Sequence, residues 1–278
     1  MNGTGYCPTG KVEKLLLATD RSEFSEGAVR EAINLAKRCS SKLYAMTVVE
    51  MFTETEALGE NVYELEEKSA RKYLDEIAAR ARAEGLDCET VVRLGDDPHA
   101  LIIEEAEDKK ADIIIMGRRG IRGLAKFLIG EVAARVIVHA PCDVLVVPRA
   151  ARIEYRNILV ATDGSEHGNN AVKKAVEIAK RCGSGILVLS AIRDESERNE
   201  AERYVKAASE LARSEGVPAE TLTPTGRSFN VIVETAGGRG VDLIVMGTYG
   251  KTGLKKAIMG SATEKVIGSA GCGVLVVK

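Results

Sequence analysis

Near the carboxyl end of the chain lies a set of residues whose types and spacing suit the binding of a phosphate group. The set consists of Gly247, Gly250, Gly260 and Ser261. Glycines let backbone N–H groups approach an anion closely, and the first turn of a helix adds partial positive charge. The apolar run 241–245 predicts a preceding buried strand, and Ser261 with Glu264 fits a helix capping box. Together these features predict a phosphate-binding loop, although glycines at a strand end can also be plain turn residues.

The first half of the chain carries a similar glycine set with one change at the helix start. Its members are Gly117, Gly120 and Gly130, followed by Glu131 instead of a serine. At about 5 Å and an effective dielectric of about 20, Glu131 and a phosphate charge repel by roughly 3 kcal/mol. One lost hydroxyl hydrogen bond costs only roughly 1 kcal/mol. We therefore expect a poorer triphosphate site here, opposed in part by three loop arginines: Arg118, Arg119 and Arg122.

The chain that surrounds these loops consists of two copies of one repeated unit. The stretch Leu16–Asp20 recurs almost unchanged as Leu159–Asp163, so each half has one aspartate after its first strand. Three further stretches recur in the same order: 36–39 as 179–182, 112–117 as 242–247, and 144–147 as 274–277. The first half has an insertion near 51–65.

Within each unit, short apolar runs alternate with amphipathic stretches. In the first half, strands are expected at 14–19, 42–49, 89–94, 111–116 and 143–147. Helices are expected after a cap at Ser25, over 64–84 with Leu65 facing inward, from Pro98, and over 132–139. The second-half strands are expected near Arg156, Gly185, Glu220, Val241 and Gly273. This alternation predicts an α/β fold with a parallel sheet between two helical layers. Ligands bind such sheets beyond the strand carboxyl ends, where the winding reverses, so each aspartate should meet its own glycine loop.

Length and composition describe an ordinary globular protein. The 278 residues are expected to form two domains, 1–150 and 151–278. The net charge of −2 provides no basic field for nucleic acid, and no apolar run is long enough to span a membrane. The N-terminus lacks an apolar signal segment, so a cytoplasmic location is expected. The six cysteines form no C-x-x-C pair; they are expected to be small buried hydrophobes rather than zinc ligands, with Cys7 in a tail that could be exposed.

These motifs resemble those of the universal stress protein family. The family pattern is glycine, two residues, glycine, nine residues, glycine, then serine or threonine; the second half matches it in full. The Ala-Thr-Asp end of the first strand resembles the family's opening strand in both halves. The resemblance implies two doubly wound, five-stranded parallel sheets of order 3-2-1-4-5, similar to the adenine nucleotide α-hydrolases. It also implies pairing of the two domains through their last strands, which can be internal here; a homodimer is a further expectation.

The resemblance also implies a ligand and the residues that hold it. Family members with the complete pattern bind ATP or related adenine nucleotides such as AMP, with Mg²⁺ or Mn²⁺ carried by the phosphates. The implied second-half site consists of Ala161, Thr162, Asp163, Ala191, Ile192, Met246, Gly247, Gly250, Gly260, Ser261, Ala262 and Thr263, with Ala191 and Ile192 bordering the adenine through their backbone. The implied weaker first-half site consists of Ala18, Thr19, Asp20, Val49, Met116, Gly117, Arg118, Gly120, Gly130 and Glu131.

The sequence contains no catalytic set at these strand ends. Each half brings one carboxylate without a paired base or nucleophile, and His167 is expected to face solvent. The leading hypothesis is therefore a regulatory, nucleotide-binding stress-response protein. One alternative is a slow ATPase or phosphotransfer enzyme that uses a metal bridging the phosphates. The other is a non-catalytic interaction module with vestigial sites, which the intact Gly260-Ser261 pair disfavours for the second half.

Overall fold

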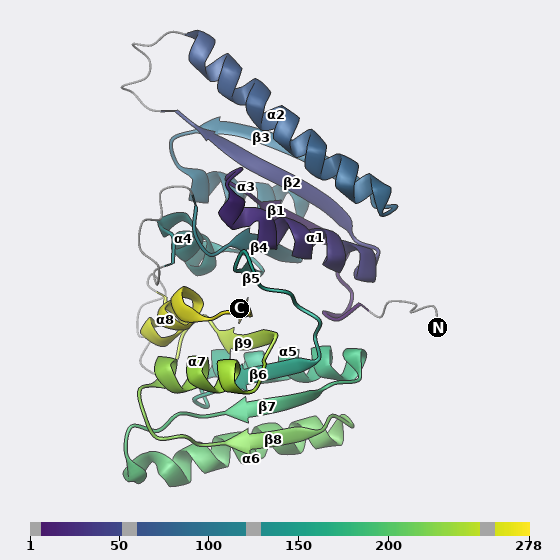
Figure 1. Cartoon of the computed structure of the whole chain (residues 1–278). Helices are drawn as coiled ribbons and strands as arrows, with labels where there is room; N and C mark the ends of the chain where they lie inside the picture. The colour runs from purple at the N-terminus through teal and green to yellow at the C-terminus, as the bar shows by residue number, and fades with distance from the viewer. Residues whose placement is uncertain (1–6, 52–59, 121–128, 251–258) are drawn as a thin grey trace.

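The computed structural model describes residues 7–51, 60–120, 129–250 and 259–278, and Figure 1 shows their arrangement. Strands and helices alternate along the chain, as predicted. The first half contains β1 (Lys14–Ala18), α1 (Glu26–Cys39), β2 (Lys42–Glu50), α2 (Glu60–Ala83), β3 (Cys88–Gly95), α3 (Pro98–Lys109), β4 (Ile113–Gly117), α4 (Glu131–His139) and β5 (Asp143–Val147). The second half contains β6 (Asn157–Ala161), α5 (Glu166–Cys182), β7 (Gly185–Leu189), α6 (Arg198–Ser214), β8 (Ala219–Leu222), α7 (Ser228–Gly238), β9 (Leu243–Gly247), α8 (Ser261–Ser269) and β10 (Gly273–Val277).

All of these strands belong to one sheet, in the order β3-β2-β1-β4-β5-β10-β9-β6-β7-β8. The predicted α/β class and the order 3-2-1-4-5 are confirmed in each half, but the two expected sheets are joined edge to edge. Neighbouring strands are parallel except at the junction of β5 and β10, where Leu275 lies opposite Leu145. Both strands are short and apolar, and their pairing covers edges that would otherwise be bare. The implied pairing through the last strands is therefore internal to the chain.

Helices cover both faces of this sheet. The apolar residues of α1, α2, α5 and α6 belong to one buried cluster, and those of α3, α4, α7 and α8 to the other. Side chains alternate between faces along a strand, so Leu15 and Leu17 join the first cluster while Leu16 joins the second. Strands that are buried on both faces need apolar residues at nearly every position. This requirement explains the continuous apolar runs in the sequence.

Ser25 is the N-cap residue of α1, as expected, but its hydroxyl donates to the Ser22 carbonyl (2.8 Å) and makes no capping hydrogen bond. Two local expectations are wrong. The N-cap of α8 is Gly260, and no capping side chain bonds there, so the predicted box at Ser261 does not form. Leu65 is 67% exposed. Helix α2 begins at Glu60, earlier than expected, and Figure 1 shows its amino-terminal turns extending past the sheet.

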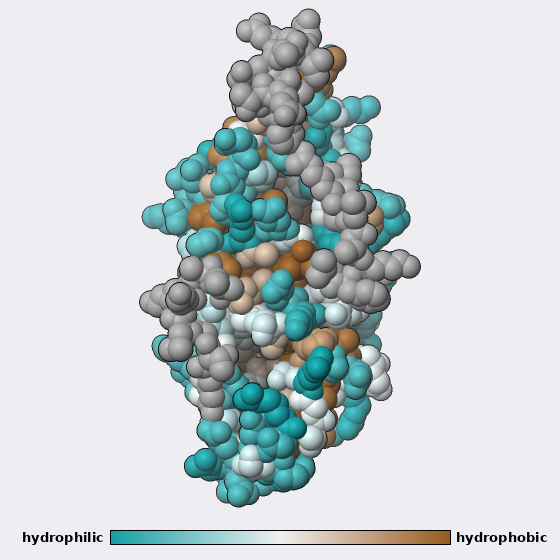
Figure 2. Space-filling view, turned by 90° about the vertical axis from the view of Figure 1, so that its left-hand side faces the viewer, coloured by the Kyte–Doolittle hydropathy of each residue, from teal (hydrophilic) through white to brown (hydrophobic). Residues whose placement is uncertain are grey.

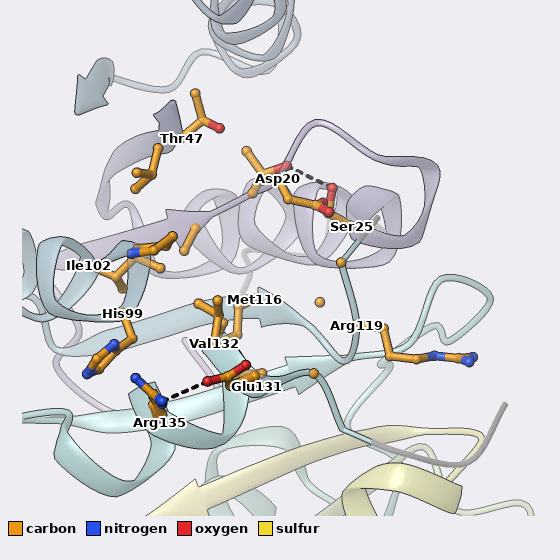
Figure 3. Close-up of a pocket in the computed structure, with 18 of the residues that line it drawn as sticks. Asp20, Ser25, Thr47, His99, Ile102, Met116, Arg119, Glu131, Val132 and Arg135 are labelled. Atoms are coloured by element: carbon orange, nitrogen blue, oxygen red, sulfur yellow. Dashed lines mark hydrogen bonds and ion pairs between the residues drawn. The ribbon is translucent and has the colours of Figure 1, made fainter. Parts of the chain in front are cut away.

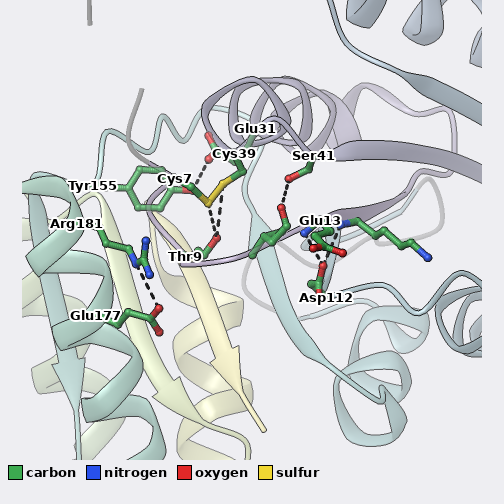
Figure 4. The surroundings of a disulfide bond; sticks show 12 residues. Cys7, Thr9, Glu13, Glu31, Cys39, Ser41, Asp112, Tyr155, Glu177 and Arg181 are labelled. Atoms are coloured by element: carbon green, nitrogen blue, oxygen red, sulfur yellow. Dashed lines mark hydrogen bonds and ion pairs between the residues drawn. A yellow bond between two sulfur atoms is a disulfide. The ribbon is translucent and has the colours of Figure 1, made fainter. Parts of the chain in front are cut away.

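A disulfide between Cys7 and Cys39 corrects the expectation that Cys7 lies in a free tail (Figure 4). The segment after Cys7 is folded against the body, because Thr9 and Val12 are both buried. The other cysteines are buried or half-buried thiols: Cys88, Cys142, Cys182 and Cys272. Burial raises the pKa of Cys88 and Cys272 to about 11 and that of Cys142 to about 12. These three thiols therefore stay protonated at neutral pH.

Tyr155 anchors the connection between the halves. Its side chain is 1% exposed, its φ is +60°, and its backbone N–H donates to Asp242 Oδ1 in the second half (2.9 Å). Its hydroxyl donates to Glu31 Oε1 on α1 (2.6 Å), and Arg30 Nη2 donates to the Ala151 carbonyl (2.6 Å). Burial raises the pKa of the Glu31 carboxyl to about 7, partly offset by the Tyr155 hydrogen bond. The connection therefore contains a carboxyl group that titrates near neutrality.

We expect the free energy of unfolding to fall by about 3 kcal/mol as pH rises from about 4.5 to about 7 because of Glu31. The unfolded chain loses the Glu31 proton near the ordinary pKa of 4.5, whereas the folded chain keeps it to about 7. The contribution is fully present below the unfolded pKa and is lost as pH passes the folded one. Urea unfolding of the parent and of Glu31→Gln across this range isolates the effect. Parallel pH curves for the two proteins would contradict the prediction.

In the described part of the chain, no helix is both long enough and apolar enough to cross a lipid bilayer.

Candidate functional site

The carboxyl ends of the first and fourth strands of each half lie side by side. In the first half Ala18 pairs with Met116, and in the second half β6 pairs with β9. The chain winds outward in opposite directions from these two strands, which makes each junction a switch point. Figure 2 looks onto this face and shows apolar side chains in its middle, between hydrophilic segments.

Each aspartate lies against the glycine loop of its own half. A Cβ atom added at Gly250 would lie 2.5 Å from Asp163 Oδ2, and one at Gly120 would lie 2.8 Å from Asp20 Oδ2. Real Cβ contacts are never this close, so glycine at both positions lets the carboxylate reach the loop backbone. The other oxygen, Asp163 Oδ1, accepts from the N–H of Ser165 (3.1 Å). The turn-forming role and the approach to the loop therefore coexist.

The loop backbone closely approaches the start of the following helix in both halves. A Cβ on Gly260 would lie 3.7 Å from the backbone nitrogen of Gly250, and one on Gly130 would lie 3.7 Å from that of Gly120. The Gly260 N–H donates to the Thr248 carbonyl (3.1 Å), which fixes the loop against α8. A helix N-terminus facing a glycine-rich loop is suited to an anion.

The remaining second-half residues fall into three groups. Ser261 is exposed at the first position of α8, and Ala161, Asp163 and Ala262 are partly exposed near the strand ends. Thr162 and Thr263 are buried and serve the backbone: Thr162 Oγ1 accepts from the Gly164 N–H (3.2 Å), and Thr263 Oγ1 donates to the Gly247 carbonyl (3.0 Å). Met246 is 5% exposed, in the core.

The two residues expected to border an adenine differ in their availability. Ala191 is partly exposed, as that role requires. Ile192 is fully buried; its N–H donates to the Pro224 carbonyl and its own carbonyl accepts from the Gly226 N–H (2.8 Å). The N–H of Ile192 is therefore engaged in pairing beside β8, which leaves only the second lone pair of its carbonyl for the expected contact; that contact stays a prediction.

The first half contains a cavity of about 770 Å³ at its switch point (Figure 3). Most of the residues expected there line it: Ala18, Thr19, Asp20, Met116, Gly117, Gly120, Gly130 and Glu131. Val49 does not; it is 2% exposed, and its neighbour Val48 lines the cavity instead. Glu131 Oε1 is paired with Arg135 Nη2 (2.7 Å), both exposed.

Arg118 points away from the cavity, which corrects its expected role as a phosphate contact. Its Nη1 donates to the carbonyls of Gly268 and Ala270, both at 3.0 Å, at the carboxyl end of α8 in the other half. The arrangement is reciprocal, because Lys278 Nζ donates to the carbonyls of Ile137 and Val138 at the end of α4. Burial and neighbouring Arg119 lower the pKa of Arg118. Each half thus caps a helix of the other with a cation, which favours the helix dipole.

We expect Arg118→Met to lower the free energy of unfolding by about 3 kcal/mol. The change removes a charged donor that serves two helix-end carbonyls, and such hydrogen bonds are each worth about 1.5 to 3 kcal/mol. Urea unfolding measures the loss. Arg135→Met is the matched control, because its exposed ion pair should contribute less than about 1 kcal/mol. Equal losses in the free energy of unfolding for the two substitutions would contradict the view that Arg118 stabilises the end of α8.

Arg119 and Tyr249, its counterpart in the second half, each pack against a ring. The Arg119 guanidinium lies over Phe24, 5.9 Å from the ring centroid. In the second half, Tyr249 meets His167 edge-on, with centroids 5.3 Å apart. His167 is only partly exposed, so the expectation that it faces solvent holds in part, and its buried Nδ1 has no hydrogen-bond partner among the described residues. The third arginine, Arg122, lies outside the described residues.

Sequence reasoning missed several residues that line the first-half cavity. They come from β2, the turn before α3, α3 itself and α4: Thr47, Asp96, Asp97, His99, Ile102 and Val132. None belongs to a local motif. The alternation of strand and helix predicted that these segment ends would share one edge, but it did not indicate which side chains would turn inward.

The fold and these strand-end loops define a tandem of two doubly wound α/β units, each with a glycine loop facing a helix N-terminus. The model of the universal stress protein family matches residues 11–148 and 154–278, and the chain belongs to that family.

Individual relatives agree with this assignment. Universal stress protein MJ0531 of Methanocaldococcus jannaschii is 38% identical over 141 residues, which cover 49% of this chain and 82% of that protein. Universal stress protein Sll1388 of Synechocystis is 30% identical over 149 residues, covering 48% of this chain and 96% of that protein. A universal stress protein structure from Archaeoglobus fulgidus has a TM-score of 0.78 at 23% identity, covering 95% of this chain and 96% of that chain. That structure shares the fold across both halves.

Proposed function

We propose that the second half binds an adenine nucleotide, ATP or AMP, and that occupancy of this site regulates the protein in a cytoplasmic stress response. One observation carries the proposal: Asp163 lies against Gly250 and Gly250 lies against the Gly260 helix start, so the carboxylate, the loop backbone and the helix N-terminus meet at one place. Membership of the universal stress protein family supports it. Mg²⁺ or Mn²⁺ would arrive with the nucleotide phosphates. Nucleic acid and membranes are not proposed partners.

The proposal assigns different roles to the two halves. Residues 1–150 form a domain with an altered phosphate motif, and residues 151–278 form the nucleotide-binding domain. Pairing of β5 with β10 joins them within one chain. Assembly of two chains into a homodimer stays a prediction that sedimentation tests.

Mass spectrometry of small molecules released from the purified protein tests the proposal directly. An adenine nucleotide at about one per chain is the expected result. Calorimetric titration of the nucleotide-free protein with ATP and AMP should then give one saturable site. Release of no nucleotide, together with no heat of binding for either compound, would leave the interaction module with vestigial sites as the better explanation.

We expect ATP turnover to be absent or far slower than the median enzyme rate of about 10 per second. The side-chain oxygens of Thr162, Asp163 and Ser165 each accept a hydrogen bond from a backbone N–H of the turn or of the first turn of α5, which is a structural role. A steady-state phosphate-release assay with Mg²⁺ and with Mn²⁺ measures the rate. Sustained hydrolysis near the median rate that disappears in Asp163→Asn would make the slow-enzyme alternative correct.

A further inference from the structure

The two halves carry different charges at equivalent positions around their strand ends. Ala18 pairs with Met46 and Ala161 pairs with Leu189. Met46 and Leu189 are therefore equivalent. Glu50 follows Met46 by four residues and Arg193 follows Leu189 by four, so Glu50 in the first half corresponds to Arg193 in the second.

Two more positions follow the same rule. Val49 pairs with Leu94, and Ile192 bridges to Thr225. Two residues further on, the strand register matches Asp96 with Arg227, and the helix starts match Asp97 with it, since both are N-caps; either way an aspartate of the first half corresponds to an arginine of the second. At the helix start, Glu131 corresponds to Ser261, since each is the first residue of its helix. Every one of these three changes makes the first half more acidic than the second.

The charges that line the first-half cavity add up to a negative site. Among the described lining residues, the carboxylates are Asp20, Glu50, Asp96, Asp97 and Glu131. The guanidinium groups are Arg119 and Arg135, which leaves a formal charge of −3 with His99 neutral. Asp97 is paired with His99, and Glu131 with Arg135. A cavity whose described lining carries a net negative charge attracts cations and disfavours phosphates.

The interior of the cavity is suited to an organic ligand. Apolar side chains from four elements line it: Met46, Val48, Ile102, Met116 and Val132. Thr47 also lines it and is only 1% exposed, and its Oγ1 has no hydrogen-bond partner in the described part of the chain. Figure 3 shows this hydroxyl on the side that faces Asp20. A buried hydroxyl without a partner is costly, so it points to a polar ligand group or water at this place.

We propose that the first-half cavity binds an organic cation of nucleoside size and rejects phosphorylated nucleotides. The carboxylates select an amine, the apolar side chains contact the body of the ligand, and the Thr47 hydroxyl completes its hydrogen bonding. A volume of about 770 Å³ is within the range of small-molecule sites. This proposal rests on the proposed function in one respect: the size and shape of the ligand are inferred from the adenine nucleotide proposed for the second half. The preference for a positive charge is inferred from the first-half residues alone.

Three probes that share the adenosine body test the charge preference: 5′-amino-5′-deoxyadenosine, adenosine and AMP, which are cationic, neutral and anionic near pH 7. Calorimetry uses the Gly260→Val variant, which is designed to disable nucleotide binding by the second half and leaves the first half unaltered. We expect the amine to bind tightest and AMP weakest, with at least about a tenfold difference between them. Raising the salt concentration should reduce this difference. Preference for AMP, or no binding of the amine, would overturn the proposal.

A charge exchange taken from the chain itself sharpens the test. The double variant Glu50→Arg and Asp96→Arg installs the second-half residues in the first half, and it should reverse the order so that AMP binds more tightly than the amine. Glu50→Gln with Asp96→Asn is the control and should only reduce the preference. An unchanged preference in the arginine variant, with an unchanged circular dichroism spectrum, would contradict the assignment of these carboxylates.

The same measurements separate this proposal from the proposed function. Gly130→Val leaves the second half unaltered, and there ATP and AMP should bind more tightly than the amine. Loss of nucleotide binding in that variant would defeat the proposed function alone. Loss of amine binding in Gly260→Val would defeat the cation site alone.

Discussion

Gly260→Val is expected to weaken adenine-nucleotide binding by the second half at least 100-fold. A Cβ at this position lies 3.7 Å from the Gly250 nitrogen, so the valine methyl groups would occupy the space between loop and helix. A phosphate excluded from there loses hydrogen bonds from backbone N–H groups. Such bonds to a charged group are worth about 1.5 to 3 kcal/mol each, so losing two costs roughly 100-fold or more in affinity.

The fold should survive this substitution, because the nearest atom to the new Cβ is the Thr248 carbonyl oxygen at 3.3 Å, a contact that a small shift relieves. The matched control is Gly130→Val, whose Cβ would lie 3.7 Å from the Gly120 nitrogen in the same setting. Calorimetry with ATP should show no change in the control, since Glu131 makes the first half a poor triphosphate site. Unchanged ATP affinity in Gly260→Val, with a folded protein, would remove the proposed site.

Cys7→Ser is expected to lower the free energy of unfolding by about 4 kcal/mol. The Cys7–Cys39 disulfide closes a loop with a sequence separation of 32. In the chain-entropy account, a cross-link of this span restricts the unfolded chain by roughly that amount. The loss should be visible as a lower urea midpoint under oxidising conditions. Adding a reductant to the parent protein should produce the same shift and leave the Cys7→Ser variant unchanged.

Cys182→Ser is the control for the disulfide, because Cys182 is the second-half counterpart of Cys39 and is a free thiol. Its small change in side chain should cost much less and should not alter the response to reductant. Disulfides are rare in the cytosol of mesophiles but common inside hyperthermophiles. The redox state of Cys7 in the cell therefore also bears on the proposed location. A urea midpoint of the parent protein that does not change when reductant is added would contradict the prediction.

The elements of this fold were predictable because their signals are local. Strand β5 begins and ends as expected from its apolar run, and α3 begins at Pro98, where the fixed φ of proline suits a first helical residue. The repeat predicted that both halves would share one topology. Alternation of strand and helix was enough to place Asp20 beside Gly120 and Asp163 beside Gly250, since parallel strands bring their carboxyl ends to one edge.

The errors arose where a side chain had a choice of partners. The capping box at Ser261 suited the local pattern, but Gly260 became the N-cap and left Ser261 exposed. Ile192 follows the correct strand, and its N–H is paired with the β8 side. His167 lies on an early helix turn but is only partly exposed, and the Tyr249 ring from a distant loop packs edge-on against it. Each outcome depends on a neighbour that the local sequence does not reveal.

The sequence by itself determined the α/β class, the duplicated unit, the glycine loops and the position of the candidate sites. These depend on periodicity and on residues within a few positions of one another. Only the tertiary structure decided that Arg118 caps a helix 150 residues away, that Tyr155 meets Glu31 across 124 residues, and that Cys7 reaches Cys39. The free energy of a buried charge or hydroxyl depends on the groups that replace water around it, and folding brings those groups together from distant parts of the chain.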